Sequence, residues 1–431
     1  MNYAETLTFL YAQLPMFQRV GAAGYKPGLG NTEVLAELLG HPERRFRAVH
    51  VAGTNGKGSS SNLLAAVLQA AGYQVGLYTS PHLREFTERI KINGQDLAPA
   101  YLVAWVEKWW PQFAPVQPSF FEMCVALAYS YFAERQVDVA IVEVGLGGRL
   151  DSTNIITPLV SLITNISFDH QNLLGDTLPA IAGEKAGIIK PGVPAIVSQR
   201  QAETAAVFEQ KAREVRAPLL FADQHYHVAA LGPAAPDADT QQLQVSGAAD
   251  LADLELALAG DYQRLNVPGV LATLEELRRQ GFVIPEAAVR EGFRAVRRLT
   301  GFRGRWTILG RRPLVVCDTG HNEAGIRFVT AQLARLPYRR LHFVLGVVND
   351  KDVTKMLGLL PPQATYYFCQ ANIPRALPAA ALAGQAAAVG LQGAVYGPVP
   401  AAVAAARAAA GPDDVVFIGG STFVVAEIEE L

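Results

Sequence analysis

The fold is decided around HVAGTNGKGSSSN (residues 50–62), where an apolar run leads into a glycine-rich turn and then into a helical pattern. Glycines let backbone N–H groups approach phosphate oxygens closely, and a helix N-terminus adds a positive dipole. Lys57 supplies a neutralising charge. In the common phosphate loop a serine or threonine follows the lysine directly and binds Mg²⁺, whereas Gly58 here separates Lys57 from Ser59. A chance glycine-rich turn is the alternative, but the ordered strand, lysine and helix favour a phosphate site whose magnesium ligands come from elsewhere.

Short apolar runs alternate with helical patterns on the C-terminal side of this segment, which indicates a parallel α/β architecture. The first part of the chain predicts a helix at 59–71 and strands at 47–53, 73–80, 137–145, 158–167 and 193–198. Residues 200–253 are less informative; they include a turn-rich segment, 232–242, expected to be a surface loop, and a helix follows at about 263–280. The alternation then restarts, with strands at 313–318, 341–348, 364–369 and 413–420 and alanine-rich helices at 379–388 and 400–410.

A chain of 431 residues is longer than one hydrophobic core usually organises. The segment TGFRGRW (300–306) breaks the helical pattern between the two α/β parts. We therefore expect a first domain at residues 1–299, a linker at 300–305 and a second domain at 306–431.

Composition excludes several classes of protein. The net charge is −2 with both signs spread along the chain, so neither a nucleic-acid footprint nor a basic membrane patch is expected. No run reaches the ~18 apolar residues of a membrane helix, and the first residues lack the pattern of a signal peptide. The three cysteines have no metal-binding spacing, which fits a reducing compartment. A cytoplasmic protein is expected.

Polar side chains stand at the carboxyl ends of predicted strands, where ligands of α/β sheets bind. Ser80 ends the strand at 73–80, Glu143 lies near the end of 137–145, and His170 follows 158–167. Ser80 has an alternative role as a turn hydroxyl and His170 as a hydrogen-bonded loop histidine. Glu143 is the strongest magnesium candidate, because a carboxylate in a buried strand needs a cation or another partner.

The chain also carries eight motifs in a fixed order: HVAGTNGKGS, GLYTSPHL (76–83), ERIKING (88–94), SFFE (119–122), EVGLGGRLDSTN (143–154), GEKAGIIKPG (183–192), DTGHN (318–322) and NDKD (349–352). Together they resemble the folylpolyglutamate synthase/dihydrofolate synthase family of the Mur ligase superfamily. The resemblance extends from about Gly28 to Phe423. It implies a P-loop-type parallel-sheet ATPase domain with a folate site, followed by a smaller Rossmann-like α/β glutamate-ligase domain.

The resemblance implies roles for individual residues of the nucleotide and metal sites. The ATP-binding residues would be Gly53, Thr54, Asn55, Gly56, Lys57, Gly58, Ser59, Asn266, Arg305 and Asp318. Mg²⁺ would be bound by Ser80, Glu143, His170 and a carbamylated Lys185, with a monovalent cation such as K⁺ as a further cofactor. The catalytic residues would be Lys57, Lys185 and His321.

Substrate residues follow from the same resemblance. Part of a pteroate pocket would be formed by Ser119, Phe120, Phe121, Glu122 and Leu150, approached by Lys26, Gly28 and Leu29. His321 and Ser421 are candidates for orienting glutamate or phosphate. Two positions depart from the family pattern: Arg303 stands where a proline is frequent, and Tyr262 where a histidine is frequent.

The implied activity is an ATP-dependent ligation of L-glutamate to folates, and to dihydropteroate, through an acyl phosphate. The partners would be these small molecules alone, with no nucleic acid or membrane, and the enzyme would be a monomer. Two alternatives remain open at this point. One is another Mur-type ligase that adds an amino acid to a cell-wall precursor; the other is a P-loop phosphotransferase or NTPase that makes no amide.

Overall fold

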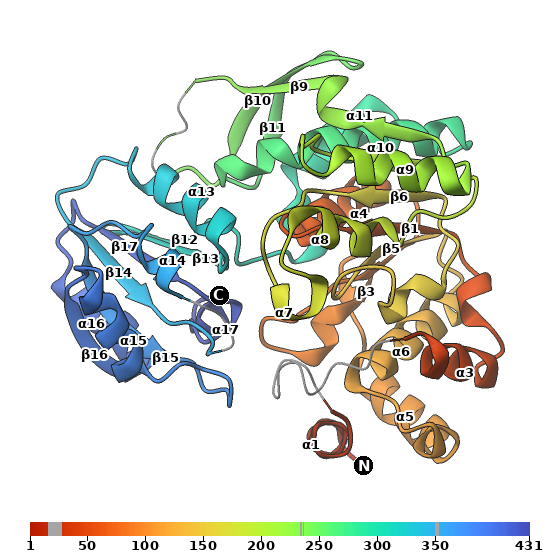
Figure 1. The fold of residues 1–431 in the computed structure, drawn as a ribbon, viewed down its shortest axis with the longest axis horizontal. Helices are drawn as coiled ribbons and strands as arrows, with labels where there is room; N and C mark the ends of the chain where they lie inside the picture. The colour runs from red at the N-terminus through yellow and green to blue at the C-terminus, as the bar shows by residue number, and fades with distance from the viewer. Residues whose placement is uncertain (16–27, 233–234, 236, 350–352) are drawn as a thin grey trace. The chain divides into compact units, whose positions relative to one another are not determined.

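The computed structural model describes residues 1–15, 28–232, 235, 237–349 and 353–431 (Figure 1). These residues separate into two compact units. The first comprises Met1–Ala229, Leu243–Glu255 and Arg264–Phe302, and the second comprises Ala230–Gln242, Leu256–Gln263 and Arg303–Leu431.

An eight-stranded sheet forms the centre of the first unit, in the order β4-β3-β2-β5-β1-β6-β7-β8. Strands β2, β5, β1, β6, β7 and β8 are parallel, and the β3–β4 hairpin extends one edge antiparallel. The central strands are buried along their whole length, which explains their continuous apolar sequences. The strands are β1 (Ala48–Ala52), β2 (Val75–Tyr78), β3 (Ile90–Ile92), β4 (Gln95–Asp96), β5 (Val139–Glu143), β6 (Val160–Ile163), β7 (Ala195–Val197) and β8 (Leu219–Phe221).

Two apolar clusters stabilise this sheet. One gathers side chains of the helices between β3 and β5 with those of α1, and the other gathers side chains of β6, β7 and the helices between β6 and β8. The helices are α1 (Tyr3–Gln13), α3 (Gly30–Leu38), α4 (Lys57–Ala70), α5 (Pro99–Phe113), α6 (Phe120–Glu134), α7 (Gln171–Leu174), α8 (Leu178–Ala186), α9 (Ala205–Val215), α10 (Val267–Arg279), α11 (Glu286–Arg294) and α12 (Val296–Thr300). Short 3₁₀ turns complete the unit: η2 (Pro42–Arg44), η3 (Phe86–Arg89), η4 (Ala114–Val116), η5 (Ser152–Ile155) and η6 (Ala222–Gln224).

Helix α4, which begins at the phosphate loop, is buried over most of its length. It packs against α10, α11 and α12. The approach to α11 is close, since a Cβ added to Gly292 would lie 2.5 Å from Cα of Val67. The helix that carries Lys57 is therefore fixed by tertiary packing rather than by its modest amphipathic pattern.

A six-stranded sheet forms the centre of the second unit, in the order β12-β13-β17-β14-β15-β16. Its strands are parallel except β12, which pairs antiparallel with β13. The strands are β12 (Thr307–Arg311), β13 (Leu314–Asp318), β14 (Leu341–Leu345), β15 (Thr365–Gln370), β16 (Gly393–Pro398) and β17 (Val415–Gly419). The helices are α13 (Glu323–Leu333), α14 (Thr354–Leu357), α15 (Ala379–Ala388), α16 (Val399–Ala409) and α17 (Thr422–Ala426), preceded by the 3₁₀ turn η7 (Asp261–Leu265).

A separate three-stranded sheet, in the order β11-β10-β9, occupies the region in which the sequence is least informative. Its strands are β9 (Tyr226–Ala230), β10 (Gln241–Gly247) and β11 (Leu251–Leu256). The expected surface loop at 232–242 lies between β9 and β10, although β10 already begins at Gln241 and residues 233, 234 and 236 are outside the described part of the chain.

The α/β class, with a parallel sheet in the N-terminal part and a second α/β unit in the C-terminal part, is confirmed. Each predicted strand overlaps an observed one, and the observed limits lie within four residues of the predicted ones. The helix predicted at 263–280 is replaced at its start by η7, so α10 begins at Val267. Among the described residues, no helix combines the length and apolarity needed to cross a membrane. The proposed limits of domains and linker stay predictions.

Candidate active site

The phosphate loop joins β1 to α4 and depends on glycine at two positions. Gly53 has φ 142° and Gly56 has φ 87°, both in the region that favours glycine. A Cβ on Gly53 would lie 1.8 Å from Oγ1 of Thr164, and one on Gly56 would lie 2.1 Å from Oδ1 of Asn266. The loop is therefore closely packed, and the structure brings the predicted nucleotide residue Asn266 directly against it.

Residues that follow β6 hold the loop in place. Asn55 donates its N–H to Oδ1 of Asn165 at 3.0 Å, and its carbonyl accepts the hydroxyl of Thr164 at 2.5 Å. Thr54 donates its hydroxyl to the carbonyl of Ser167 at 3.1 Å. Sequence reasoning did not single out Thr164 or Asn165. The feature that could have indicated them is a pair of polar residues directly after the apolar run PLVSLI (158–163).

Lys57 bends back over the loop that precedes it. Its Nζ donates to the carbonyls of Gly53 at 3.0 Å and Thr54 at 3.3 Å. The ammonium thus lies over the backbone at which a phosphate would bind. Ser59 is buried in α4, and the displacement of its hydroxyl from the usual magnesium position stays a prediction.

Glu143 is the last residue of β5, and its neighbour in register on β1 is Val51. Its side chain is buried, and Oε2 accepts the N–H of Ser80 at 3.2 Å. Both carboxylate oxygens lie 3.8 Å from the point that a Cβ on Gly58 would occupy. The structure therefore brings Ser80, Glu143 and the start of α4 together.

Lys185 lies in the last turn of α8 with its side chain buried. Burial, and to a smaller extent the positive charge of Lys57, lower the pKa of Lys185 to about 7, against the opposite effect of Asp169, Asp151 and Glu184. A substantial fraction of this amine is neutral at neutral pH. A neutral amine is the form that can react with carbon dioxide.

His170 stands between β6 and α7 in the left-handed region, with φ 51°. Its Nε2 lies 3.8 Å from Oδ1 of Asp169, and the side chain is partly exposed. Asp169 also acts on the pKa of Lys185, so this loop and α8 lie within electrostatic range of each other. The sequence did not single out Asp169.

The donors in this region fit magnesium bound together with a nucleotide. Across the described ranges, no three His, Cys, Asp or Glu side chains converge into a site made by protein groups alone. Mg²⁺ is usually bound by one or two carboxylates and completed by phosphates and water. The buried carboxylate of Glu143, beside the phosphate loop, is a donor of this kind.

Ser119 and Glu122 form the N-terminal cap of α6. Glu122 accepts the N–H of Ser119 at 2.6 Å, Ser119 accepts the N–H of Glu122 at 3.2 Å, and Asn31 donates to Glu122 at 3.3 Å. Phe120 belongs to the apolar core, and a Cβ on Gly145 would lie 2.4 Å from Cζ of Phe121. These contacts give the SFFE segment a structural role; its assignment to a pteroate pocket stays a prediction.

The remaining predicted substrate residues of the first unit are spread over two segments. Leu150 is partly buried in the loop after β5, Leu29 precedes α3, and Gly28 has φ 122°. Lys26 lies outside the described residues.

The loop after β5 is tied to β1 by a buried polar network. Asp151 accepts the N–H of Leu146 at 2.8 Å and the hydroxyl of Thr153 at 2.5 Å, and Thr153 lies 2.8 Å from Nε2 of His50. Because the Thr153 hydroxyl donates to Asp151, Nε2 of His50 must be the donor to Thr153. This network connects the strand before the phosphate loop with the loop that carries Leu150.

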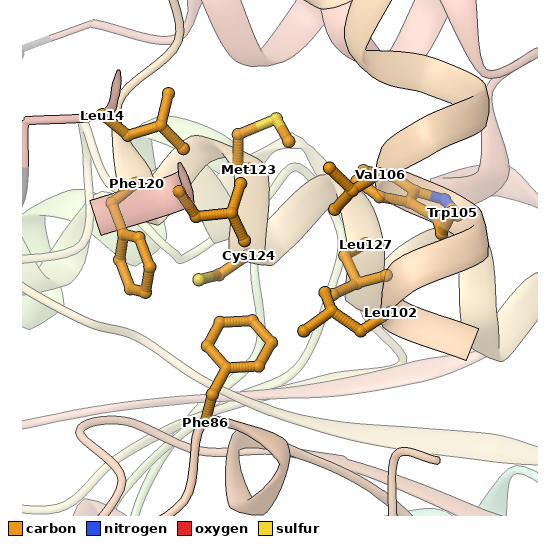
Figure 2. A pocket seen from close by; sticks show the side chains of 10 residues that line it. Leu14, Phe86, Leu102, Trp105, Val106, Phe120, Met123, Cys124 and Leu127 are labelled. Atoms are coloured by element: carbon orange, nitrogen blue, oxygen red, sulfur yellow. The ribbon is translucent and has the colours of Figure 1, made fainter. Parts of the chain in front are cut away.

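An apolar cavity of about 10 Å³ lies between α1, α5, α6 and η3 (Figure 2). Its lining includes Phe86, Trp105, Phe120 and Cys124. It has room for about one water molecule and is too small for a pteridine. It is a packing gap in the core rather than a substrate site.

In the second unit, the polar residues at the end of β13 form one cluster. Asp318 accepts the hydroxyl of Tyr262 at 2.6 Å and the N–H of Trp306 at 2.8 Å. Arg305 donates to the hydroxyl of Thr319, and Nδ1 of His321 lies 3.0 Å from the Thr319 carbonyl. The structure thus brings together the predicted residues Arg305, Asp318 and His321.

Ser421 and Arg303 have different surroundings from that cluster. Ser421 is buried at the start of α17, where its hydroxyl accepts the N–H of Phe423 at 3.1 Å. Arg303 donates to the carbonyl of Leu431. The contacts therefore distinguish the two linker arginines: Arg305 is part of the cluster at β13, and Arg303 is bound to the last residue of the chain.

The sequence matches two domain families. Residues 51–274 match the Mur ligase middle domain, and residues 304–422 match the Mur ligase glutamate ligase domain. Folylpolyglutamate synthase of Lacticaseibacillus casei is 36% identical over 392 residues, covering 88% of each chain. Dihydrofolate synthase/folylpolyglutamate synthase of Bacillus subtilis is 37% identical over 363 residues, covering 82% of this chain and 83% of its own.

Solved structures agree with these relatives. The structure of Escherichia coli FolC in complex with DHPP and ADP superposes with a TM-score of 0.87 at 30% identity, covering 100% of this chain and 97% of that one. Folylpolyglutamate synthase of Mycobacterium tuberculosis, complexed with ADP and AMPPCP, gives a TM-score of 0.87 at 32% identity, covering 99% and 98%. This chain belongs to the folylpolyglutamate synthase/dihydrofolate synthase family of the Mur ligases.

Proposed function

We propose that this protein is an ATP-dependent ligase that joins L-glutamate to the free carboxylate of folates and of dihydropteroate. One observation carries the proposal: the buried carboxylate of Glu143 lies beside Gly58 in a loop where Lys57 faces the phosphate position. A buried carboxylate next to a phosphate loop needs a cation. The relatives' names supply the substrates, glutamate and folates.

In the first step, the γ-phosphoryl group of ATP passes to an oxygen of the substrate carboxylate, giving ADP and an acyl phosphate. The loop N–H groups and Lys57 hold the phosphates, and Asn266 lies against the loop at Gly56. Positioning and charge neutralisation account for most of the rate in such a transfer. Arg305 and Asp318 are further residues proposed to bind the nucleotide.

In the second step, the amine of glutamate attacks the acyl phosphate carbonyl. A tetrahedral intermediate forms and collapses with release of phosphate, leaving an amide. His321 and Ser421 are the residues proposed to orient glutamate or phosphate. Ser119, Phe120, Phe121, Glu122, Leu150, Lys26, Gly28 and Leu29 are proposed to form or approach the site of the pteroate body.

Magnesium would be held by Glu143, Ser80, His170 and Lys185, and when bound it would neutralise the phosphate charge. A carbamate on Lys185 supports this arrangement, because an ammonium would repel the metal and a carbamate would attract it. The lowered pKa of Lys185 favours its formation. A monovalent cation such as K⁺ is a further proposed cofactor. We also propose a cytoplasmic monomer.

A direct test measures ADP release from MgATP with glutamate plus either tetrahydrofolate or dihydropteroate, and identifies the products by mass. The expected result is ADP release that depends on glutamate, with a product heavier by one glutamyl residue. ADP release at the same rate without glutamate would favour a plain NTPase and contradict the ligase.

A further inference from the structure

The motif ERIKING (88–94) has no role in the site described above, yet it contains β3 and the turn of the β3–β4 hairpin at the edge of the first unit's sheet. Its turn is made by Asn93 and Gly94, with φ 47° and 74°. Asn93 exchanges two hydrogen bonds with Val75 of β2, at 2.8 Å and 3.0 Å. The hairpin is therefore fixed to the sheet.

The hairpin also binds the C-terminal end of α12. The Nζ of Lys91 donates to the carbonyl of Thr300 at 2.9 Å, and Lys91 pairs with Asp96 at 3.1 Å. A Cβ on Gly94 would lie 2.1 Å from the carbonyl oxygen of Leu299, so the turn lies directly against the last turn of the helix. The last carbonyls of a helix need partners from outside it, and a cation is favourable there. Lys91 is buried at this position.

Two residues beyond Thr300, the ring of Phe302 reaches the phosphate loop. Its Cε2 lies 3.6 Å from the point that a Cβ on Gly58 would occupy. The two carboxylate oxygens of Glu143 lie 3.8 Å from the same point. The aromatic ring and the candidate magnesium ligand therefore approach the start of α4 together.

We propose that Phe302 shields the phosphate loop beside Glu143 from water, and that Lys91 positions the Phe302 ring by holding the end of α12. This inference rests on the proposed ligase function. An acyl phosphate can react with water in place of the glutamate amine: the water oxygen bonds to the acyl group, phosphate leaves, and the free carboxylate returns. ADP is then formed without amide. Excluding water from the site prevents this loss and strengthens the attraction between phosphate and cations.

The test compares the wild type with Phe302→Ala in MgATP, glutamate and tetrahydrofolate, counting ADP released per glutamylated product. The wild type should release about one ADP per product, and Phe302→Ala about two or more. Phe302→Tyr should restore the wild-type ratio, because it keeps the ring. Phe9→Ala is the matched control, because Phe9 is a half-buried phenylalanine of the same unit that packs on Trp110. Its ratio should stay at the wild-type value.

Lys91→Met tests the positioning step. The number of ADP molecules released per glutamylated product should rise as in Phe302→Ala. The double variant should show no higher value than Phe302→Ala alone, because Lys91 acts through the ring. A wild-type ratio in a folded Phe302→Ala that makes amide would refute the shielding role, and an additive double variant would refute the role of Lys91. A wild type that makes no amide would instead refute the proposed function, and this inference with it.

Discussion

The amine of Lys185 is buried within electrostatic range of Lys57, and the two cations oppose each other's charge. Burial is the larger influence, and together they lower the pKa of Lys185 to about 7. At neutral pH a substantial fraction of this lysine, at the end of α8 and near the loop of Asp169, carries no charge. It is well suited to react with carbon dioxide and become an anion.

The first prediction concerns this lysine. Lys185→Ala should be nearly inactive, and a small carboxylic acid such as acetate should restore part of the activity by replacing the carbamate. Carbamate formation needs the neutral amine, whose fraction rises as the pH increases through about 7. At a fixed concentration of dissolved carbon dioxide, enzyme depleted of carbon dioxide should therefore recover faster at pH 8 than at pH 6. Full activity of Lys185→Ala without added acid would contradict the role.

The second prediction concerns Glu143 and His170. Glu143→Gln keeps the size of the side chain but removes the charge beside Gly58, so kcat should fall by about 100-fold or more. His170→Ala should also lower kcat, with a higher magnesium requirement. Circular dichroism of both variants should match the wild type. Near-normal turnover with unchanged magnesium dependence in both would contradict the assignment.

Much of the fold follows from local sequence. Strands such as β1 and β5 are short apolar runs because both of their faces are buried, and a run of this kind is readable without tertiary information. The phosphate loop is equally readable, because its glycines, Lys57 and α4 are consecutive. The β9–β11 sheet was not foreseen. Its strands alternate buried and exposed positions only partly and are separated by a turn-rich segment.

The site was harder to read, since its contacts join distant segments. That Thr164 and Asn165 hold the loop depends on β6 lying beside β1. That Phe302 lies against Gly58 depends on where α12 ends. The contacts of Glu122 show a helix cap that its motif did not indicate, and its assignment to substrate binding stays a prediction. A motif identifies which residues matter more readily than it identifies the atoms they contact.

The third prediction concerns acid stability. Burial, with a smaller contribution from Lys190, lowers the pKa of His50 to about 3. In the unfolded chain the pKa is near 6.5, so His50 stays neutral in the fold while the unfolded state gains a proton as the pH falls below that value. The contribution of His50 to the free energy of unfolding is therefore fully present above about pH 6.5. It is lost as the pH falls toward 3, by roughly 5 kcal/mol at most.

His50→Gln, which keeps a donor for Thr153, should show a smaller fall in thermal unfolding temperature between pH 7 and pH 4.5 than the wild type. His227→Gln is the control, because His227 is exposed on β9 and should leave the acid dependence unchanged. Equal acid dependence in wild type and His50→Gln would show that His50 does not carry it.

The fourth prediction is that one site serves two acids. Dihydropteroate and tetrahydrofolate both present a pteridine-aryl body and a free carboxylate, so the same phosphorylated end can accept either. With dihydropteroate, glutamate and MgATP, dihydrofolate should be detected by mass spectrometry. Tetrahydrofolate should inhibit the formation of dihydrofolate competitively. Efficient glutamylation of tetrahydrofolate with no dihydrofolate product would leave the polyglutamylating activity alone.

The last prediction separates the two linker arginines. Arg305 contacts Thr319 and lies in the cluster that contains Asp318, whereas Arg303 donates to the carbonyl of Leu431. Arg305→Ala should therefore lower kcat/KM for MgATP by about tenfold or more, as expected when a charged donor to phosphate or nucleotide is lost. Arg303→Ala should leave kcat/KM near the wild type and act mainly on the thermal unfolding temperature. Each variant removes one guanidinium, and the two positions lie close together in the chain. Each variant is therefore the control for the loss of one positive charge in the other. The reverse ranking would mean that the nucleotide-binding arginine is Arg303, two positions earlier in the linker.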